Sequence, residues 1–365
     1  MIYCINTIGT ETGLHYYDTA LRNAFRAKGA EVTVLSNYAT DGGGRPFFGN
    51  FYHGSKPARV ARLAQGWLRT LAFYLRHRRG NHFIYQSFGL RPLDILFVLI
   101  FAGNPRFSIV AHDLLEITGD GTDRRRALKL WIYRHCIPAV ICHSENSLRD
   151  LKAFGYTGRT IYYPHFSYDF PKEVDMARVE RDVIDAVDPA KTNFLFFGQL
   201  RATKGITILL DAIDRLAQEG RTEGINIVIA GHDKQGFMTG RPDCPFVHAV
   251  CRYIDDSELN YLFTRCQFVL LPYTEIYQSG VLEAVIYFRR PALMSDVDYF
   301  TQMKAAYPSF GDVYAPNNGA ALADCIRRHV ADRSPYFAEA DVRRYEEQHD
   351  ATRLVDFILQ GGRTQ

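Results

Sequence analysis

Two short segments in the C-terminal half of the chain combine residue types that suit a charged, hydroxyl-rich ligand. The first, FFGQLRATKG, leads from an apolar strand through a glycine turn to two cations, Arg201 and Lys204. The second, EIYQSGVLE, places two carboxylates, Glu275 and Glu283, eight positions apart around a small-residue turn. Fixed cations and helix amides bind phosphates, and carboxylates accept hydrogen bonds from hydroxyls. Together the segments indicate a nucleotide-sugar site.

The cations of the first segment stand at the start of a predicted helix. Because a helix N-terminus carries partial positive charge, Lys204 in the first turn is unfavourable unless an anion lies nearby. A phosphate bound between Arg201 and Lys204 removes that conflict; the alternative is a solvated pair of surface cations. In the second segment, Ser279, Gly280 and Val281 open another helix and offer amide N–H groups to a phosphate.

The elements that position these residues alternate between short apolar strands and longer helices. In the first half, the pattern predicts strands at 2–6, 31–36, 82–86, 107–111, 139–142 and 160–163, and helices at 12–28, 57–77, 93–102, 124–136 and 144–154. In the second half, it predicts strands at 194–197, 226–230, 247–249, 268–271 and 291–294, and helices at 204–219, 256–264, 280–288, 319–330 and 341–359. Short buried strands separated by such helices are typical of parallel, doubly wound sheets.

The alternation is interrupted between Pro164 and Lys191, which we interpret as a connection between two domains. The predicted fold class is therefore α/β, with two Rossmann-like domains facing each other across a cleft. We expect one Rossmann-like domain over 1–165 and a second over 166–344. Ligands of open α/β sheets bind at the carboxyl ends of the strands, so we expect the site there.

With these motifs in place, the chain resembles the retaining glycosyltransferases of the GT-B fold, family 4, over nearly its whole length. Besides the two segments, the resemblance rests on Gly9 and Gly13 after the opening strand and on the motifs AHD at 111–113, AVICHSE at 139–145, YPH at 163–165 and IAG at 229–231. The resemblance implies a GT-B architecture and transfer of a sugar from a nucleotide donor. It also implies that 1–165 is an N-terminal acceptor domain, completed by the C-terminal helix at about 345–365, and that 166–344 is the nucleotide-sugar donor domain.

For the donor, the resemblance assigns a role to each residue of the two segments. Arg201 and Lys204, beside Gly198, hold the diphosphate. Glu283 binds the ribose hydroxyls, and Glu275 faces the donor sugar.

Other residues are assigned to the reacting centre and the acceptor. A histidine like His112 lies beside the reacting centre and contacts the sugar; a structural, hydrogen-bonded histidine is the alternative. The loop from Gly9 to Gly13 closes over phosphate and acceptor. Asp113 is expected near the acceptor, unless it caps the turn that follows.

The nucleotide base is expected beside backbone groups of Tyr253 and Ile254, where nothing separates uracil from guanine. The chain departs from the family at two positions. Gln278 replaces a common glycine of the turn, and Gln199 replaces a common arginine, whose charge Arg201 supplies from two residues on.

Charge is distributed unevenly along the chain, whose net charge is +3. Residues 1–163 hold 21 lysines and arginines against 11 acidic residues, whereas residues 164–365 hold 22 against 29. No acidic residue lies between Asp41 and Asp94, although nine basic residues do. We therefore expect the first half of the protein to bind an anionic partner.

The helix predicted over 57–77 carries much of this positive charge. Its arginines gather on one side, and Val60, Leu68 and Leu75 belong to an apolar stripe centred opposite them. An ordinary helix packed on a sheet explains the stripe, but not the missing acids. We therefore expect residues 45–91 to contact an anionic membrane or a lipid-diphosphate acceptor. Nucleic acid is not expected as a partner, because no nucleic-acid-binding module is recognisable.

Composition narrows the remaining possibilities. The seven cysteines are scattered without a C-x-x-C pair, which indicates thiols in a reducing compartment rather than disulfides or zinc ligands. Asp296 and Asp298 spell a D-x-D, but they follow a strand and begin a helix, so we expect neither a metal nor another cofactor. The chain opens directly into a strand and has no long apolar run, so we expect neither a signal peptide nor a membrane span.

We therefore predict a cytoplasmic enzyme, associated with the inner face of the membrane. It would move a sugar from a UDP- or GDP-sugar onto a hydroxyl of a glycan or lipid-linked acceptor, in cell-surface polysaccharide biosynthesis. The resemblance implies a retaining, metal-independent hexosyltransferase. A sugar-nucleotide epimerase or hydrolase on the same fold is one alternative, and a non-catalytic GT-B partner subunit is another.

Overall fold

The computed structural model describes residues 1–9, 13–39, 46–51, 54–114, 123–170, 173–276, 279–330, 332 and 334–359. Its internal contacts divide the chain into two compact units. Unit 1 comprises Met1–Ser167 and His349–Gln365, and unit 2 comprises Tyr168–Gln348. The divisions fall at 167/168 and 348/349, against the expected 165/166 and 344/345.

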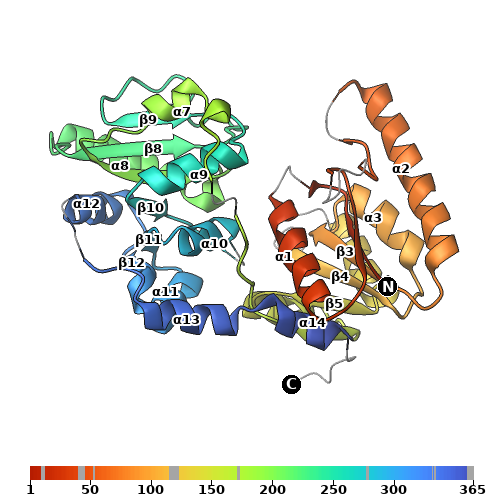
Figure 1. The fold of residues 1–365 in the computed structure, drawn as a ribbon. Coiled ribbons are helices and arrows are strands. Elements are labelled where there is room, and N and C mark those ends of the chain that lie inside the picture. Colours follow the sequence, from red (N-terminus) through yellow and green to blue (C-terminus); the bar gives the residue numbers. More distant parts are fainter. Residues whose placement is uncertain are drawn as a thin grey trace. The chain divides into compact units, whose positions relative to one another are not determined.

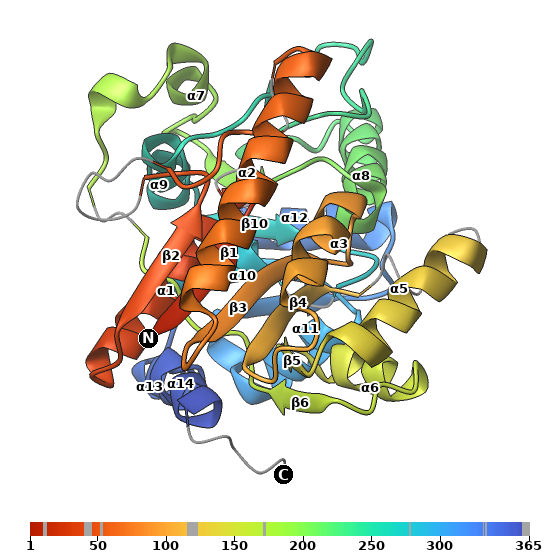
Figure 2. The same cartoon turned by 90° about the vertical axis from the view of Figure 1, so that its right-hand side faces the viewer.

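Unit 1 is built on a parallel sheet of six strands in the order β2-β1-β3-β4-β5-β6. The strands are β1 (Ile2–Asn6), β2 (Val32–Ser36), β3 (His82–Phe88), β4 (Phe107–Asp113), β5 (Ala139–Cys142) and β6 (Arg159–Tyr162). The helices are α1 (Leu14–Ala27), α2 (Lys56–His77), α3 (Pro92–Val98) with the 3-10 turn η2 (Leu99–Phe101), α5 (Asp123–Cys136), α6 (Glu145–Ala153) and α14 (Ala351–Leu359). α1 covers one face of the sheet, and α2 and α3 cover the other (Figures 1 and 2).

Unit 2 has a second parallel sheet, in the order β12-β11-β10-β7-β8-β9. Its strands are β7 (Thr192–Phe197), β8 (Ile225–Ala230), β9 (Val247–Val250), β10 (Phe268–Leu271), β11 (Ala292–Ser295) and β12 (Gly311–Tyr314). Its helices are α7 (Arg181–Asp185), α8 (Ile206–Gln218), α9 (Asp256–Arg265), α10 (Gly280–Tyr287), α11 (Asp298–Ala306), α12 (Gly319–His329) and α13 (Glu339–Gln348), with 3-10 turns η3 (Met176–Arg178), η4 (Ala202–Lys204) and η5 (Pro308–Phe310).

Both sheets are buried on their two faces, which explains why the strands read as unbroken apolar runs. In unit 2, buried side chains of α8 and α12 pack on one face with the inward residues of the strands. On the other face, the ring of Phe263 from α9 contacts Phe197 and Phe288. The twelve parallel strands confirm the predicted α/β class with two Rossmann-like sheets.

One predicted helix is wrong. The sequence pattern runs unbroken from 341 to 359, but the structure ends α13 at Gln348 and starts α14 at Ala351. The break is stabilised locally, because the carboxylate of Asp350 accepts hydrogen bonds from the amide and hydroxyl of Thr352, at 2.9 and 2.6 Å. This side chain competes with the helix for backbone donors. The short break is where the chain passes from unit 2 back to unit 1.

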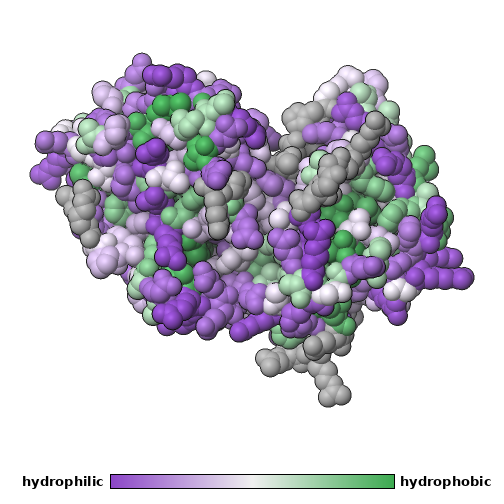
Figure 3. Space-filling view, viewed as in Figure 1, coloured by the Kyte–Doolittle hydropathy of each residue, from purple (hydrophilic) through white to green (hydrophobic). Residues whose placement is uncertain are grey.

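α2 packs on its sheet through a narrower stripe than the sequence predicts. Trp67 and Leu71 lie against the core of unit 1. Val60, Leu68 and Leu75, assigned to the same apolar stripe, are 65%, 60% and 54% exposed. Apolar and hydrophilic side chains consequently alternate along the edge of unit 1 that α2 forms (Figure 3). No helix in the described part of the chain is long and apolar enough to cross a bilayer.

Candidate functional site

The start of α10 is the part of unit 2 best suited to hold a phosphate. Ser279 caps the helix, because its Oγ accepts a hydrogen bond from the amide of Leu282 at 3.2 Å. The amides of Gly280 and Val281 belong to the first turn, where N–H groups lack partners within a helix. An anion placed here meets these donors and the positive end of the helix dipole.

Lys204 reaches this helix start through Tyr273. The Lys204 Nζ donates a hydrogen bond to the Tyr273 hydroxyl at 2.9 Å and lies 4.2 Å from the centre of that ring. The hydroxyl in turn lies 3.4 Å from the Ser279 Oγ. Tyr273 is buried and held in place, because its carbonyl accepts hydrogen bonds from Ser295 and Asn317. The predicted cation and the predicted helix start are thus joined by a tyrosine that sequence reasoning missed.

The turn that carries Lys204 differs from the prediction. Lys204 ends the 3-10 turn η4, before α8, and so does not lie in the first turn of the helix. Gly205 follows with a φ of 73°, and a Cβ there would lie 1.7 Å from the carbonyl oxygen of Pro272. Only glycine allows this approach of the turn to the end of β10. Arg201 lies just before η4 with an exposed side chain.

The end of β7 lies close to the start of α10. Gly198 follows β7, and a Cβ there would lie 3.6 Å from the Cγ2 of Val281 in α10. Gly231, after β8, approaches still more closely, since its Cβ would lie 1.8 Å from the carbonyl oxygen of Gly198. Glycine at the end of β8 therefore allows the backbone of the two strand ends to pack closely together beside α10. Gln278, the unusual residue of the turn, lies outside the described residues.

The two carboxylates of the E-x7-E element have different surroundings. Glu275 is exposed, and the residue before it is tied to η4 by a hydrogen bond from the Thr274 amide to the Thr203 carbonyl at 3.1 Å. Glu283 is buried, and its Oε1 accepts a hydrogen bond from the hydroxyl of Tyr345 at 2.8 Å. Burial and the neighbouring Glu283 carboxylate raise the pKa of Tyr345, so this hydroxyl keeps its proton. Tyr345 is a second contact that sequence reasoning missed.

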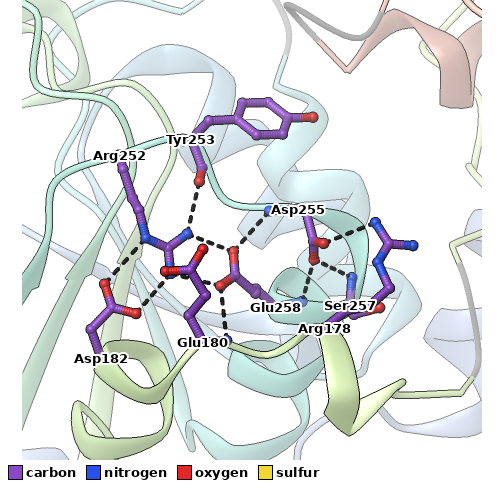
Figure 4. Close-up of polar contacts among 8 residues, drawn as sticks. All are labelled: Arg178, Glu180, Asp182, Arg252, Tyr253, Asp255, Ser257 and Glu258. Atoms are coloured by element: carbon purple, nitrogen blue, oxygen red, sulfur yellow. Dashed lines mark hydrogen bonds and ion pairs between the residues drawn. The ribbon is translucent and has the colours of Figure 1, made fainter.

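The loop predicted to seat the nucleotide base is held by a cluster of charges around Arg252 (Figure 4). The guanidinium pairs with Asp182 at 2.7 Å and with the buried Glu258 at 2.7 Å, and its Nη1 donates to the carbonyl of Tyr253 at 3.0 Å. Burial alone would raise the pKa of Glu258, but hydrogen bonds from Arg252 and from backbone amides bring that pKa below its usual value. Ile254 is buried, whereas the Tyr253 ring is 55% exposed.

In unit 1, His112 lies near the end of β4 among buried polar and aromatic side chains. Its Nε2 lies 2.6 Å from the Oε1 of Gln86, and its ring is 4.7 Å from that of Tyr17. The Tyr17 hydroxyl also contacts the Nε2 of His143 at 2.9 Å. Burial, and then the nearby His143 and His165, hold the pKa of His112 well below its usual range. The imidazole is therefore neutral at neutral pH and acts through hydrogen bonds rather than charge.

The other predicted residues of unit 1 lie at the carboxyl ends of its strands. Gly9 follows β1 with a φ of 50°, and a Cβ there would lie 1.9 Å from the Oδ1 of Asn37. Its amide donates to the Oδ1 of Asn6 at 2.7 Å. Gly13, in the left-handed conformation, begins α1, and residues 10–12 between the two glycines lie outside the described part. Asp113 is the last residue of β4, and its side chain is not among those described.

Comparison with known proteins finds likeness in structure but not in sequence. No protein-family model and no curated protein matches the chain. Its structure is similar to that of WaaG, a glycosyltransferase involved in lipopolysaccharide biosynthesis, with a TM-score of 0.66, 16% identity and coverage of 99% of this chain and 100% of that one. It is also similar to sucrose-phosphate synthase from Thermosynechococcus elongatus, with a TM-score of 0.62, 16% identity and coverage of 99% and 97%.

A third similar structure is HepE from Anabaena in complex with UDP and glucose, with a TM-score of 0.63, 13% identity and coverage of 99% and 98%. At such low identities, likeness establishes the fold alone, and the function has to be argued from the site. Two six-stranded parallel sheets, matched over their whole length by these proteins, show that the chain has the GT-B fold.

Proposed function

We propose that the chain is a retaining, metal-independent glycosyltransferase that moves a sugar from a nucleoside-diphosphate donor to a hydroxyl acceptor. The observation that carries the proposal is the contact of Lys204, Tyr273 and Ser279 at the start of α10. A cation, a buried hydroxyl and a helix N-terminus converge there, as a diphosphate requires. The structural neighbours support this proposal, since several are glycosyltransferases.

The chemical problem in such a transfer is the departure of an anionic diphosphate while the sugar becomes cation-like. Arg201, Lys204 and the amides at the start of α10 would stabilise the charge that grows on the leaving phosphate. Glu275, exposed on a loop anchored to η4, would orient the donor sugar. His112, held neutral, would contact that sugar by hydrogen bonding. With the acceptor attacking from the face that the phosphate leaves, the anomeric configuration is retained.

We propose UDP as the first nucleotide to test, with GDP next. HepE was solved with UDP, and the trehalose-phosphate synthases similar to this chain are described as UDP-forming. The ring of Tyr253, 55% exposed beside the Arg252 cluster, would stack on the base in this proposal.

The acceptor we propose is a glycan or a lipid-linked sugar of cell-surface polysaccharide biosynthesis, met at an anionic membrane on its cytoplasmic side. This part of the proposal is supported by α2, where Arg69 and Arg76 directly follow Leu68 and Leu75 in sequence and all four side chains are exposed. Basic residues near an anionic leaflet each contribute about 1 kcal/mol, and exposed leucines gain by entering the interface.

The test begins with the donor. Thermal-shift screening against UDP-, GDP- and ADP-sugars should identify one nucleotide that raises the melting temperature, because it binds the folded state. With that donor, Lys204→Ala and Glu275→Ala should each abolish transfer while the protein stays folded. Lys191→Ala, which removes a lysine paired with Asp188 elsewhere in unit 2, is the matched control and should transfer normally.

The two alternative functions predict different results when the protein is incubated with nucleotide sugars. Incubation of the donor alone would yield an epimer or stoichiometric hydrolysis if the enzyme were an epimerase or hydrolase. A non-catalytic subunit would bind none of the nucleotide sugars. Undiminished transfer by Lys204→Ala would contradict the proposed site.

A further inference from the structure

A chain of buried hydrogen bonds joins His112 to Asp18, a residue of α1 that plays no part in the function proposed above. The Nε2 of His112 lies 2.6 Å from the Oε1 of Gln86 in β3. The Nε2 of Gln86 donates to the Oδ1 of Asp18 at 3.1 Å. All three side chains are buried, so these contacts are shielded from water. Burial raises the pKa of Asp18 to about 6, against hydrogen bonds that lower it, so the carboxylate is ionised at pH 8.

The ionised carboxylate of Asp18 determines the direction of both hydrogen bonds between Asp18 and His112. A carboxylate only accepts, so Gln86 must turn its NH₂ group towards Asp18. The carbonyl oxygen of Gln86 then faces His112, and it too can only accept. The Nε2 of His112 must therefore carry the proton and donate. Without Asp18, a glutamine amide can present either end to an imidazole at similar cost, and the ring proton would not be assigned to one nitrogen.

A second branch leads from the same carboxylate to the glycine loop. The Nδ2 of Asn6 in β1 donates to the Oδ2 of Asp18 at 2.5 Å. This leaves the Oδ1 of Asn6 to accept the amides of Ile8 and Gly9, at 3.0 and 2.7 Å. Tyr38, which follows β2, adds a third donor to Asp18, through its hydroxyl at 2.8 Å.

We propose that Asp18 is a positioning residue for the transfer reaction: its buried carboxylate orients the amides of Gln86 and Asn6, and through them the ring of His112 and the backbone at Gly9. The proposal rests on the proposed function, in which His112 contacts the donor sugar. Asp18 is buried and is assigned no contact with either substrate. It would hold the His112 ring and the backbone at Gly9 in a fixed geometry while the charge on the sugar changes, because hydrogen bonds to an ionised group are stronger than those between neutral groups.

The protonation of His112 distinguishes a positioning role of Asp18 from a role in stability alone. A stabilising Asp18 would lower the melting temperature when replaced but leave the imidazole of His112 unchanged. A positioning Asp18 controls which nitrogen carries the ring proton. Spectra of ¹⁵N-histidine-labelled full-length protein at pH 8 report this directly, with the His112 signals assigned by their loss in His112→Gln.

The expected result for the wild-type protein is a single, slowly exchanging proton on the Nε2 of His112. Gln86→Met removes the acceptor and should abolish that protected signal. Asp18→Asn replaces one accepting oxygen with an NH₂ group, so the amide of Gln86 is no longer held in one orientation and the ring proton should no longer be confined to Nε2. In transfer assays, Gln86→Met and Asp18→Asn should lower kcat by about tenfold or more with little change in donor KM, because the groups assigned to the donor diphosphate belong to unit 2.

Asp94→Asn is the matched control. Asp94 is equally buried in unit 1, but it accepts its hydrogen bond from Tyr85, which does not belong to the hydrogen bonds that join Asp18 to His112. It should lose stability without changing the His112 proton or kcat. A His112 Nε2 proton that persists unchanged in Asp18→Asn would overturn the proposal. If Asp18→Asn fails to fold, Asp18→Ala, which removes the accepting carboxylate, decides in its place, with the same expected loss and the same contradicting outcome. The spectra do not depend on turnover. An inactive protein with the expected spectra would therefore contradict the proposed function but support the orientation of His112 by Asp18.

Discussion

At the scale of single residues, Tyr273 shows how one hydroxyl can organise an anion site. It lies between a lysine and a helix cap, so Tyr273→Phe removes a hydrogen bond to a cation but keeps the ring beneath Lys204. We expect the donor Kd to rise about tenfold, which corresponds to about 1.4 kcal/mol, as measured by isothermal titration calorimetry. Tyr336→Phe, which loses a hydrogen bond to Asp332 elsewhere in unit 2, should leave the donor Kd unchanged. Equal affinities in the wild type and Tyr273→Phe would show that the hydroxyl is not part of the site.

The buried histidines of unit 1 make its stability depend on pH. Burial lowers the pKa of His143 to about 3 and that of His165 to about 4, whereas histidines of an unfolded chain titrate near 6.5. As the pH falls below 6.5, the unfolded chain binds protons that the folded chain does not. The free energy of unfolding should therefore fall towards pH 4, by up to about 1.4 kcal/mol per pH unit for each histidine. Asp18, with its raised pKa, acts in the opposite direction below pH 6 and offsets part of this loss.

Urea unfolding between pH 7.5 and 4.5 measures this slope. His143→Gln keeps a donor for the Tyr163 carbonyl and an acceptor for Tyr17 but does not titrate. The slope should become shallower by the contribution of one histidine. A variant with the wild-type slope would mean that His143 does not stay neutral in the folded protein.

The sequence predicts those site residues whose chemical role follows from the residues next to them in the chain. Lys204 and Ser279 were found because a cation and a small residue stand next to predicted helix starts. Tyr273 and Asp18 were not found, because their roles come from contacts with residues distant in sequence. Nothing in the strand–turn pattern distinguishes a buried tyrosine hydroxyl beside a lysine from one that merely fills the core.

At the scale of elements, the closeness of η4 to the end of β10 depends on one glycine. Gly205→Ala adds left-handed strain and places a Cβ against the Pro272 carbonyl, so we expect a loss of about 3 kcal/mol or more in urea unfolding. Gly220→Ala is the matched control. Gly220 also has positive φ, at 63°, but no atom lies within 4 Å of its Cβ position, so the loss should be about 1 kcal/mol. Equal losses would mean that the turn can move away from Pro272.

Sequence periodicity predicted most elements and failed where side chains override it. All strands of the two sheets except β12 were predicted, because residues buried on two faces leave continuous apolar runs. The helix over 341–359 was wrongly predicted as one, because periodicity does not register a break that Asp350 stabilises locally. The strand β12 was missed, since the short segment GDVY carries no apolar run. The packing of α2 was also not predictable, because its apolar arc is wider than the part that touches the sheet.

At the scale of the whole molecule, the exposed part of the apolar stripe on α2 is the surface that we expect to bring the protein to a membrane. We expect the wild-type protein to bind vesicles that contain anionic lipid and not vesicles of zwitterionic lipid alone, as measured by flotation. The double variant Leu68→Gln, Leu75→Gln should lose about tenfold or more in partitioning, because each buried leucine contributes about 1.5–3 kcal/mol. Leu359→Gln, at an exposed position of α14, should bind as the wild type does. Absence of wild-type binding would contradict the membrane contact and leave the transferase proposal intact.

The return of the chain from unit 2 to unit 1 at His349 has a consequence for synthesis on the ribosome. α14 packs beside α1, although more than three hundred residues separate them in sequence, and Lys28 pairs with Asp356 at 2.7 Å. Proteins usually complete their domains in the order in which they are translated. Here unit 1, which is begun first, lacks α14 until residues 351–359 have been translated, after all of unit 2, so unit 2 can finish folding before unit 1.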